Sequence, residues 1–368
     1  FESNIKLNNT LKSTSCPQFC LREISGVKNV NSPEFLMSRL QRSGLKVISG
    51  LVDVTNYLTV DFCRPLHVFD KDKVKGEIKI RNSKKGEKFF GLDDKDYILD
   101  DGMIVICDEE KIISLAGIMG GKNTACDEKT ENILLESAYF CPDNISWTGR
   151  NLNILSDARY RFERGIDPNS TLVGIELATK MIIENCGGRV GSIVSDSILK
   201  IEQSKISVET NFFEKILGSV IDDLTIVEKL EKIGCDVKIS KKILNVVPPT
   251  WRPDIKMKAD LVEEVGRLVG YNKIPSKKFD TNRKKDEKLI SVSQKLKKKI
   301  RELLVSNNIM EIISWSFVNK KWESNLGAER FLELENPISS ELSCLRSNLT
   351  GGLLNIISKN NNKKINNI

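Results

Sequence analysis

Histidine is almost absent from this chain of 368 residues, in which His67 is the only one. The nine cysteines are scattered and contain no CxxC pair, so the sequence holds none of the usual zinc-binding arrangements. Dispersed cysteines in odd number predict free thiols in a reducing compartment, and we therefore expect a cytoplasmic protein. No run of eighteen apolar residues occurs, which predicts that no segment spans a membrane.

The charge excess is small and basic, with 57 lysines and arginines against 50 acidic residues and a net charge of +7. This balance permits a polyanionic partner such as RNA without requiring one. The length predicts two or three domains rather than one core. The chain starts at Phe1 without a signal-peptide pattern, which predicts an internal portion of a longer protein.

Helix and strand patterns alternate over residues 16–202 and predict a mixed α/β domain, preceded by a polar, frayed lead-in at residues 1–15. Ser32 and Pro33 form a helix-start signal, with Ser32 as the cap and Pro33 at the first helical position. The other elements expected are strands at 78–80, 103–107 and 112–118 and a helix from Ser170 to Ile183 that ends before Gly187.

A small α+β module is predicted over residues 203–274. Its expected elements are a strand at 206–208, helices at 212–217 and 224–233, and a hairpin at 237–247. Asp254 is expected to cap and open a last helix. This order resembles a winged-helix-like module, a fold that often binds nucleic acid but does not by itself establish a function.

The charged stretch at 275–288 is nearly free of apolar residues and predicts a linker. A third region covers residues 289–368. It contains an amphipathic helix pattern at 290–305 and an apolar run at 312–317 that is typical of a strand.

Thr55, Asn56 and His67 place a hydroxyl, a carboxamide and the only imidazole within a short segment. Histidine is the usual proton carrier near neutral pH, so the segment is a candidate for acid–base chemistry. The alternative is that Thr55 and Asn56 hydrogen-bond a turn or a cap and that His67 is a core residue. The residues alone favour this structural interpretation.

Two other patterns follow apolar strands. The glycine-rich run from Ala116 through Gly117 to Gly121 lacks the lysine of a phosphate-binding loop, so a tight turn is the favoured interpretation. Glu136 continues the apolar run at 133–135, where an unpaired buried carboxylate is costly. It either ends the strand in water or faces a pocket.

Two charged segments allow a binding role or a structural one. The arginines between Ser156 and Gly165 could contact phosphates or form surface ion pairs, which are the more frequent use of such runs. The carboxylates of the second module could bind Mg²⁺, which takes oxygen ligands, or could form a solvated acidic face near a helix start. These four residues are Asp254, Asp260, Glu263 and Glu264.

Taken together and in order, these segments resemble the beta chain of bacterial phenylalanine–tRNA ligases. The matching motifs are VDVTNY, RPLHVFD, LAGIMGG, LLESAYF, SDARYRFERGID and WRPDI followed by DLVEEVGRLVGY. The resemblance extends from about Cys16 to Leu354, and it is the joint match that is specific. The family's N-terminal tRNA-binding barrel and C-terminal anticodon-binding domain have no counterpart in this sequence.

The resemblance implies an α+β multidomain protein. Its parts would be a mixed α/β editing module with a β-sandwich core, the winged-helix-like module, and the start of an antiparallel, class II synthetase-like domain without catalytic residues. In the family a separate alpha subunit joins phenylalanine to tRNA(Phe) with ATP, and the beta chain hydrolyses tyrosine wrongly attached to that tRNA. The expected assembly is an α2β2 heterotetramer that binds neither DNA nor a membrane.

By the same resemblance, Glu136 accepts a hydrogen bond from the tyrosine phenol, with the backbone of Ala116 and Gly117 beside it. A site built for this hydroxyl leaves its acceptor unpaired when phenylalanine enters, which provides a second sieve. The attacking water and the terminal adenosine of the tRNA are positioned by Thr55, Asn56 and His67. The pocket is lined by Ser156 and Ala158.

The four acidic residues from Asp254 to Glu264 correspond to Mg²⁺ ligands near the alpha-subunit interface in the family. Two alternatives to an editing hydrolase stay open. One is a non-catalytic RNA-binding or assembly scaffold, since related modules are attached to other tRNA enzymes. The other is a stand-alone metal hydrolase that uses the acidic cluster.

Overall fold

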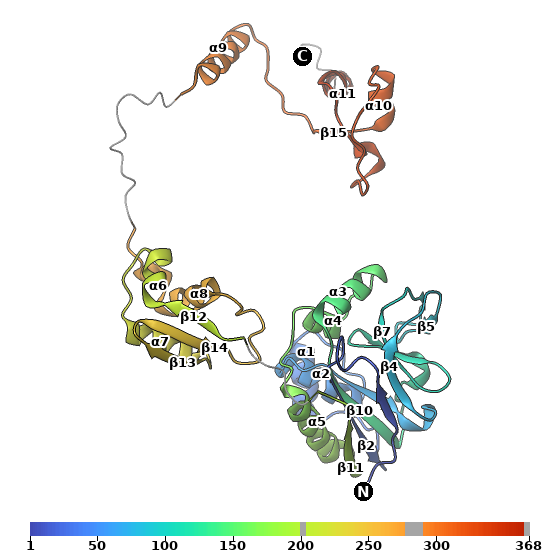
Figure 1. Cartoon of the computed structure of the whole chain (residues 1–368). Helices are drawn as coiled ribbons and strands as arrows, with labels where there is room; N and C mark the ends of the chain where they lie inside the picture. The colour runs from blue at the N-terminus through green and yellow to red at the C-terminus, as the bar shows by residue number, and fades with distance from the viewer. Residues whose placement is uncertain (199–203, 277–289, 364–368) are drawn as a thin grey trace. The chain divides into compact units, whose positions relative to one another are not determined.

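The computed structural model describes residues 1–198, 204–276 and 290–363. The chain divides into two compact units, Phe1–Ser276 and Lys277–Ile368 (Figure 1). Both contain helices and small β-sheets, so the fold class is α+β with several small sheets. No helix among the described residues is long and apolar enough to cross a membrane.

Two sheets form the centre of the first part of the chain. The five-stranded sheet has the order β1-β4-β7-β8-β9, and the four-stranded sheet has the order β11-β2-β10-β3. The strands of the first sheet are Leu7–Asn9, Ile78–Asn82, Ile104–Cys107, Ile112–Leu115 and Met119–Gly120. Those of the second are Arg189–Ser195, Gln18–Ser25, Asn132–Tyr139 and Leu66–Asp70, and the short strands β5 and β6, Lys88–Phe90 and Asp96–Ile98, pair separately.

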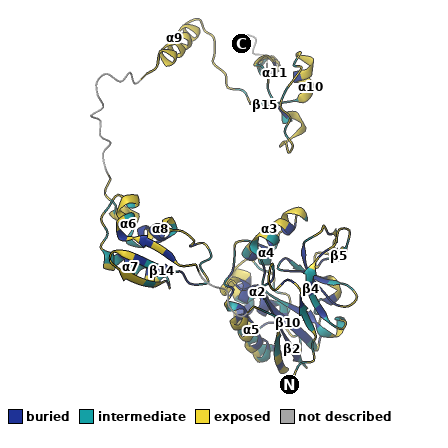
Figure 2. Cartoon of the chain, viewed as in Figure 1, coloured by how far each residue is buried: buried dark blue, intermediate teal, exposed yellow. Residues whose placement is uncertain are grey.

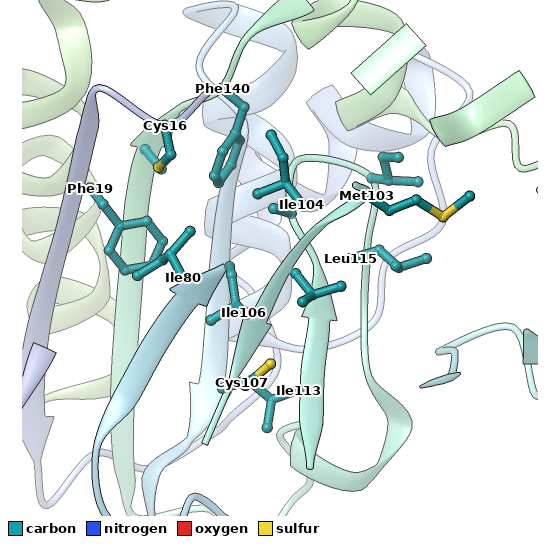
Figure 3. Packing of buried hydrophobic residues seen from close by; sticks show 14 of the residues in the cluster. Cys16, Phe19, Ile80, Met103, Ile104, Ile106, Cys107, Ile113, Leu115 and Phe140 are labelled. Atoms are coloured by element: carbon teal, nitrogen blue, oxygen red, sulfur yellow. The ribbon is translucent and has the colours of Figure 1, made fainter. Parts of the chain in front are cut away.

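One apolar core receives side chains from both sheets. Phe19 from β2, Ile80 from β4 and Ile106 from β7 are fully buried in it. Figure 3 shows these three side chains gathered in the space between the strands. Alternate side chains of a strand point to opposite faces. Leu134 and Ala138 of β10 belong to this core, so the side chain of Glu136, which lies two residues from each, points to the same face.

Two helices cover the opposite face of the four-stranded sheet. They are α2, Gly50–Asp61, and α5, Ser170–Cys186, which form a second core with Ile133 and Leu135 of β10. The VDVTNY motif lies inside α2, whereas the sequence predicts only that Thr55 and Asn56 hydrogen-bond a turn or a cap. The other helices of this part are α1, Glu34–Arg42, α3, Pro142–Asn151, and α4, Asp157–Phe162.

The helix predicted after Ser32 is present as α1, but its start differs. Pro33 is the N-cap residue rather than the first helical residue. The Ser32 hydroxyl does not cap the helix, because it donates to the buried Asp53 carboxylate at 2.6 Å. The helix predicted from Ser170 is confirmed as α5, which ends at Gly187 with φ of +69°.

The prediction of a frayed lead-in over residues 1–15 is wrong. Leu7–Asn9 form β1, which pairs in parallel with β4. The side chain of Asn9 is buried and donates to the carbonyls of Cys16 at 2.8 Å and Asp196 at 3.0 Å. A polar side chain of this segment therefore hydrogen-bonds backbone groups of the folded chain instead of water. The polarity of the sequence alone does not distinguish these two cases.

The second module contains a three-stranded sheet of order β12-β14-β13 with three helices. The predicted strands, hairpin and first two helices are present as β12, β13, β14, α6 and α7. Their bounds are Ile206–Glu209, Asp236–Ser240, Ile243–Val247, Thr210–Leu217 and Asp223–Lys232. The last helix, α8, spans Lys258–Val269, so the prediction that Asp254 opens it is wrong. The side chain of Asp254 binds Arg252 instead, and Asp260 accepts from the free backbone N–H of Met257 at 2.8 Å.

The β13–β14 hairpin is closed by Lys241 and Lys242, whose φ angles are +48° and +64°. Two-residue hairpin turns with positive φ at both positions favour Asn-Gly, because other residues are strained there. We expect Lys241→Asn/Lys242→Gly to stabilise the module by about 1 kcal/mol, seen as a higher melting temperature. The control, Lys241→Ala/Lys242→Ala, removes the same charges and should give no gain. An equal gain in both variants would trace the effect to charge.

The second unit begins with α9, Val292–Ser306, which confirms the predicted amphipathic helix. Its described residues are exposed (Figure 2). The predicted strand at 312–317 is wrong in extent, because only Phe317–Val318, β15, pairs with a neighbour, β16 at Cys344–Leu345. The remaining helices are α10, Lys320–Asn325, and α11, Thr350–Asn361. Most of the predicted linker at 275–288 lies outside the described residues.

Candidate active site

One cavity of about 830 Å³ gathers most of the residues that the sequence singled out. Its size is within the range of pockets for small molecules. Its lining includes seven of the eight predicted catalytic and pocket residues, namely Thr55, Asn56, His67, Gly117, Glu136, Ser156 and Ala158. Ala116 does not line it and is buried beside Gly117. Segments up to about a hundred residues apart in sequence therefore converge on one space.

His67 and Glu136 lie directly opposite each other on adjacent strands. The antiparallel register of β10 and β3 pairs Glu136 with His67, and the next pair along is Ser137 with Leu66. Directly opposed residues on one face have their Cβ atoms about 5 Å apart, which brings the two side chains together. The sheet thus places the only imidazole beside the strand carboxylate.

Burial keeps both of these groups uncharged near neutral pH. It raises the pKa of Glu136 to about 8, because the ionised carboxylate loses its hydration. It lowers the pKa of His67 to about 4, because the imidazolium is disfavoured in the same way. The buried Nε2 atom of His67 has no hydrogen-bond partner among the described residues. Such orphaned, shifted groups are typical of functional sites.

Gly120 makes room for the imidazole. A Cβ atom added there would lie 2.2 Å from Cε1 and 2.5 Å from Nε2 of His67, far inside contact distance. The ring also packs edge-on against Phe69, with ring centres 4.4 Å apart. The ring therefore contacts both a glycine and an aromatic side chain, which restricts its orientation.

Gly117 forms the turn after β8. The Ile118 N–H donates to the Leu115 carbonyl at 3.0 Å, and Gly117 has φ of +67° at the third position of this turn. Turns with positive φ at that position require glycine or asparagine. An added Cβ would also approach Phe140 and Phe162 to 2.9 and 3.0 Å. The tight-turn interpretation holds, and the turn also forms part of the cavity wall.

Ser156 caps helix α4 as well as lining the cavity. Its hydroxyl accepts from the Arg159 N–H at 3.1 Å and donates to the Ile118 carbonyl at 2.7 Å, which ties α4 to the glycine turn. The arginines of this segment form local contacts rather than a free cationic surface. Arg161 pairs with Asp157 at 2.9 Å, and Arg164 pairs with Glu163 at 2.7 Å. These contacts fit the ion-pair interpretation.

Thr55 and Asn56 reach the cavity from α2. The Thr55 hydroxyl donates to the Val52 carbonyl of the same helix at 2.7 Å. Asp53 was not singled out from the sequence, although it holds the loop before the helix. Its buried carboxylate accepts from the Ile48 N–H at 2.9 Å and from Ser32. The only signal for Asp53 in the sequence is that it is a charged residue between apolar ones, Val52 and Val54.

The acidic residues of the second module do not converge on a shared space. Among the described residues, no group of three or more His, Cys, Asp or Glu side chains could hold a metal ion. Arg252 bridges Asp254 at 2.6 Å and Glu264 at 2.9 Å, and Arg267 also binds Glu264, at 2.6 Å. The guanidinium of Arg252 lowers the pKa of both Asp254 and Glu264. Glu263 has no such partner within the described chain.

Three family models match this chain along its length. They are the B3/4 domain at residues 15–187, the tRNA synthetase B5 domain at 206–271 and the phenylalanyl tRNA synthetase beta chain CLM domain at 274–368. An N-terminal fragment of the phenylalanyl-tRNA synthetase beta subunit from Pyrococcus horikoshii is a structural match. It has a TM-score of 0.37 and 17% identity, and the match covers 74% of this chain and 76% of that chain.

The phenylalanine–tRNA ligase beta subunit of Nitrobacter winogradskyi is 41% identical over 346 residues. The match covers 94% of this chain and 43% of that protein. The corresponding subunit of Rhodopseudomonas palustris is 40% identical, over 93% of this chain and 43% of its own length. The chain thus spans less than half the length of these relatives, and it belongs to the family of phenylalanine–tRNA ligase beta subunits.

Proposed function

We propose that this chain hydrolyses tyrosyl-tRNA(Phe) in its cavity, as part of a phenylalanine–tRNA ligase. The observation that carries the proposal is that the buried Glu136 and the half-buried His67, whose Nε2 has no hydrogen-bond partner among the described residues, lie opposite each other in the lining of one cavity. A phenol entering the cavity brings a hydroxyl that can form a hydrogen bond with the Glu136 carboxyl group. Phenylalanine brings none and leaves the pair unsatisfied, which disfavours its binding.

Hydrolysis of the ester needs a positioned water and donors for the oxyanion that develops. His67 is neutral at pH 7, because burial keeps its pKa near 4, so its imidazole can accept a hydrogen bond from that water. Thr55 and Asn56 face the same cavity and would hold the water or the terminal sugar. Gly117, Ser156 and Ala158 form the wall, with Ala116 supporting it from behind.

Three lysines among the lining residues support a tRNA substrate. These rim lysines are Lys46, Lys73 and Lys122, and each is partly or fully exposed to solvent. Exposed lysines are suited to contact phosphates, which position nucleic acids without reading their sequence. Lys73 and Lys122 also pair with Asp127 at 2.7 Å and Asp94 at 3.0 Å, so their charge is shared. Lys46 has no such ion pair in the described part of the chain.

A magnesium site at Asp254, Asp260, Glu263 and Glu264 is part of the family expectation. Carboxylate oxygens suit Mg²⁺ chemically, but the side chains as arranged do not fit the ion, because Arg252 lies between Asp254 and Glu264. No step of the proposed reaction therefore uses a metal. The same proposal assigns ATP-dependent attachment of phenylalanine to an alpha subunit, in a cytoplasmic α2β2 complex.

We further infer the finer domain descriptions from the family. The two sheets that share a core would be the β-sandwich of an editing module. The sheet β12-β14-β13 with α6, α7 and α8 would be the winged-helix-like module. The region after residue 289 would begin a class II synthetase-like domain.

The deciding experiment is deacylation by the purified chain of tyrosyl-tRNA(Phe) and phenylalanyl-tRNA(Phe) side by side. We expect hydrolysis of the tyrosyl ester in clear preference, with the preference lost in Glu136→Ala. Because a hydrogen bond to a buried partner is worth about 1–3 kcal/mol, the preference should fall roughly tenfold to a hundredfold.

The competing function is a non-catalytic RNA-binding or assembly scaffold. The rim lysines are compatible with it, but it leaves the buried Glu136 and His67 pair without a role. If the chain leaves tyrosyl-tRNA(Phe) intact even with an alpha subunit present, the scaffold function takes the place of the editing function. Loss of deacylation with EDTA would instead favour a metal hydrolase.

A further inference from the structure

Arg64 is an almost completely buried cation that no predicted site includes. It is 1% exposed, and among the described residues it forms no ion pair, although the charge of Asp167 acts on it from a distance. Burial lowers its pKa to about 10, so it remains charged at neutral pH. Burying a charge without an ionic partner is costly, and its hydrogen bonds must offset the loss of hydration.

All hydrogen bonds of its guanidinium go to uncharged acceptors, on β10 and at the start of α5 with the loop before it. One terminal nitrogen donates to the Ala138 carbonyl of β10 at 2.7 Å. Nε donates to the Ser170 hydroxyl at 2.8 Å, and the other terminal nitrogen donates to Ser170 and to the Asp167 carbonyl. Arg64 therefore fastens the end of β10 to the start of α5.

The bond to Ala138 replaces one that the backbone cannot make. The register pairs Ser137 with Leu66, so the next position places Pro65 opposite Ala138. Proline has no N–H and cannot donate to the ladder. The guanidinium of Arg64 supplies this donor, and it extends the pairing of β3 with β10 by one position.

The surroundings of Arg64 are shaped to hold it. A Cβ added at Gly174 of α5 would lie 2.6 Å from Cγ of Arg64, so the helix leaves space for the side chain. The Ser137 hydroxyl donates to the Thr171 carbonyl at 2.7 Å, which is a second tie between β10 and α5. The backbone N–H of Arg64 donates to the Leu58 carbonyl of α2 at 3.2 Å. Arg64 thus contacts the elements that carry Asn56, His67 and Glu136.

We propose that Arg64 is a positioning residue for the cavity, which fixes the register of β3 against β10 and so holds His67 beside Glu136. Register matters here because a slip by one residue turns every side chain of the strand to the other face. The inference rests on the proposed editing function for its kinetic consequence. Its structural content does not depend on that function.

The test uses the full chain with Arg64→Lys, which keeps the charge but loses the fork of donors. We expect the ratio of kcat/KM for tyrosyl-tRNA(Phe) to that for phenylalanyl-tRNA(Phe) to fall at least about tenfold, because small displacements of reacting groups are costly. A second readout is the pH titration of the single imidazole by NMR. We expect its midpoint to move toward the ordinary value for histidine as the ring loses its enclosure.

Ser170→Ala is a milder second variant, which removes one acceptor and leaves Arg64 in place. It should shift both readouts in the same direction by a smaller amount. The control is Arg22→Lys, since Arg22 is also a buried arginine against α5, bound to Glu176 and Thr179. We expect it to lower the melting temperature without changing the selectivity ratio or the imidazole titration.

An unchanged ratio and an unchanged imidazole titration in folded Arg64→Lys would overturn the proposal. So would equal changes in Arg22→Lys, because they would assign the effect to stability alone. If Arg64→Lys does not fold, the same outcomes are judged on Ser170→Ala. If the wild-type chain does not hydrolyse the tyrosyl ester, the proposed function fails, but the imidazole titration still tests the role of Arg64.

Discussion

Gly120→Ala is expected to reduce hydrolysis of tyrosyl-tRNA(Phe) at least about a hundredfold, because it displaces the only imidazole. The added Cβ would lie 2.2 Å from the His67 ring, which also packs against Phe69 and so has little room to move. The φ of Gly120 is not in the left-handed region, so alanine strains the ring rather than the backbone. The measurement is kcat and KM for the tyrosyl ester.

A double-mutant cycle identifies the cause of this loss. In a His67→Ala background the ring is gone, and adding Gly120→Ala should cost almost nothing more. Gly191→Ala is the control, since it places a Cβ 3.0 Å from the Glu23 carbonyl oxygen and 3.2 Å from the Phe1 ring, on an outer strand of the same sheet as His67. It should leave the rate unchanged. If the two losses in the cycle are additive, the displacement of His67 is not the cause.

Glu136→Gln is expected to make the protein more stable above neutral pH, by on the order of 4 kcal/mol at pH 8. The pKa of Glu136 is about 8 in the folded chain against 4.5 for an ordinary glutamate. The folded state therefore holds a proton that the unfolded state has lost, and stability falls as pH rises through this window. Glutamine does not titrate, so the difference between the two proteins grows from about pH 4.5 and levels off above about pH 8.

His67 has the opposite linkage and must be separated from this effect. Its folded pKa of about 4 lies below the ordinary 6.5, so its contribution is lost as pH falls from 6.5 to 4. In the wild type the two slopes oppose each other between about pH 4.5 and 6.5. Denaturant unfolding at a series of pH values measures both. The control, Glu131→Gln, changes an exposed glutamate next to β10, and its free energy of unfolding should differ from that of the wild type by the same amount at every pH. If the difference for Glu136→Gln is also independent of pH, the Glu136 carboxyl is not buried.

The sequence predicts helices best where the spacing of apolar residues and the residues that end a helix indicate the same segment. Helix α5 was predictable because its apolar positions recur at helical spacing and a glycine follows it. Helix α2 was not, because VDVTNY consists of residues that favour strands and turns and is helical only through its packing against α5. The same limit applies to residues 312–317, whose strand pattern lacks a partner over most of its length.

The site could be assembled from the sequence only through the resemblance. Glu136 follows three apolar residues, which raised the possibility of a pocket, but its pairing with His67 is a matter of register and needs the sheet. Arg64 carries no sequence signal of its function as an anchor, because it donates to a backbone carbonyl that is distant in the chain. Asp53 holds the backbone of the preceding loop and the Ser32 hydroxyl, and this pairing also needs the folded structure. The ion pairs of Arg252 with Asp254 and Glu264 could likewise not be predicted, because the carboxylates alone do not show which cation lies between them.

The neutral state of the Glu136–His67 pair has a consequence for turnover. The bound ester is uncharged at its acyl group, and at pH 7 so are the two buried groups beside it. Hydrolysis converts that ester into a carboxylate, and neither of these uncharged groups offers it an ion pair; the cations among the described lining residues are the rim lysines. The reaction thus creates a charged product that Glu136 and His67 do not stabilise, and free tyrosine should be a weak inhibitor of the chain.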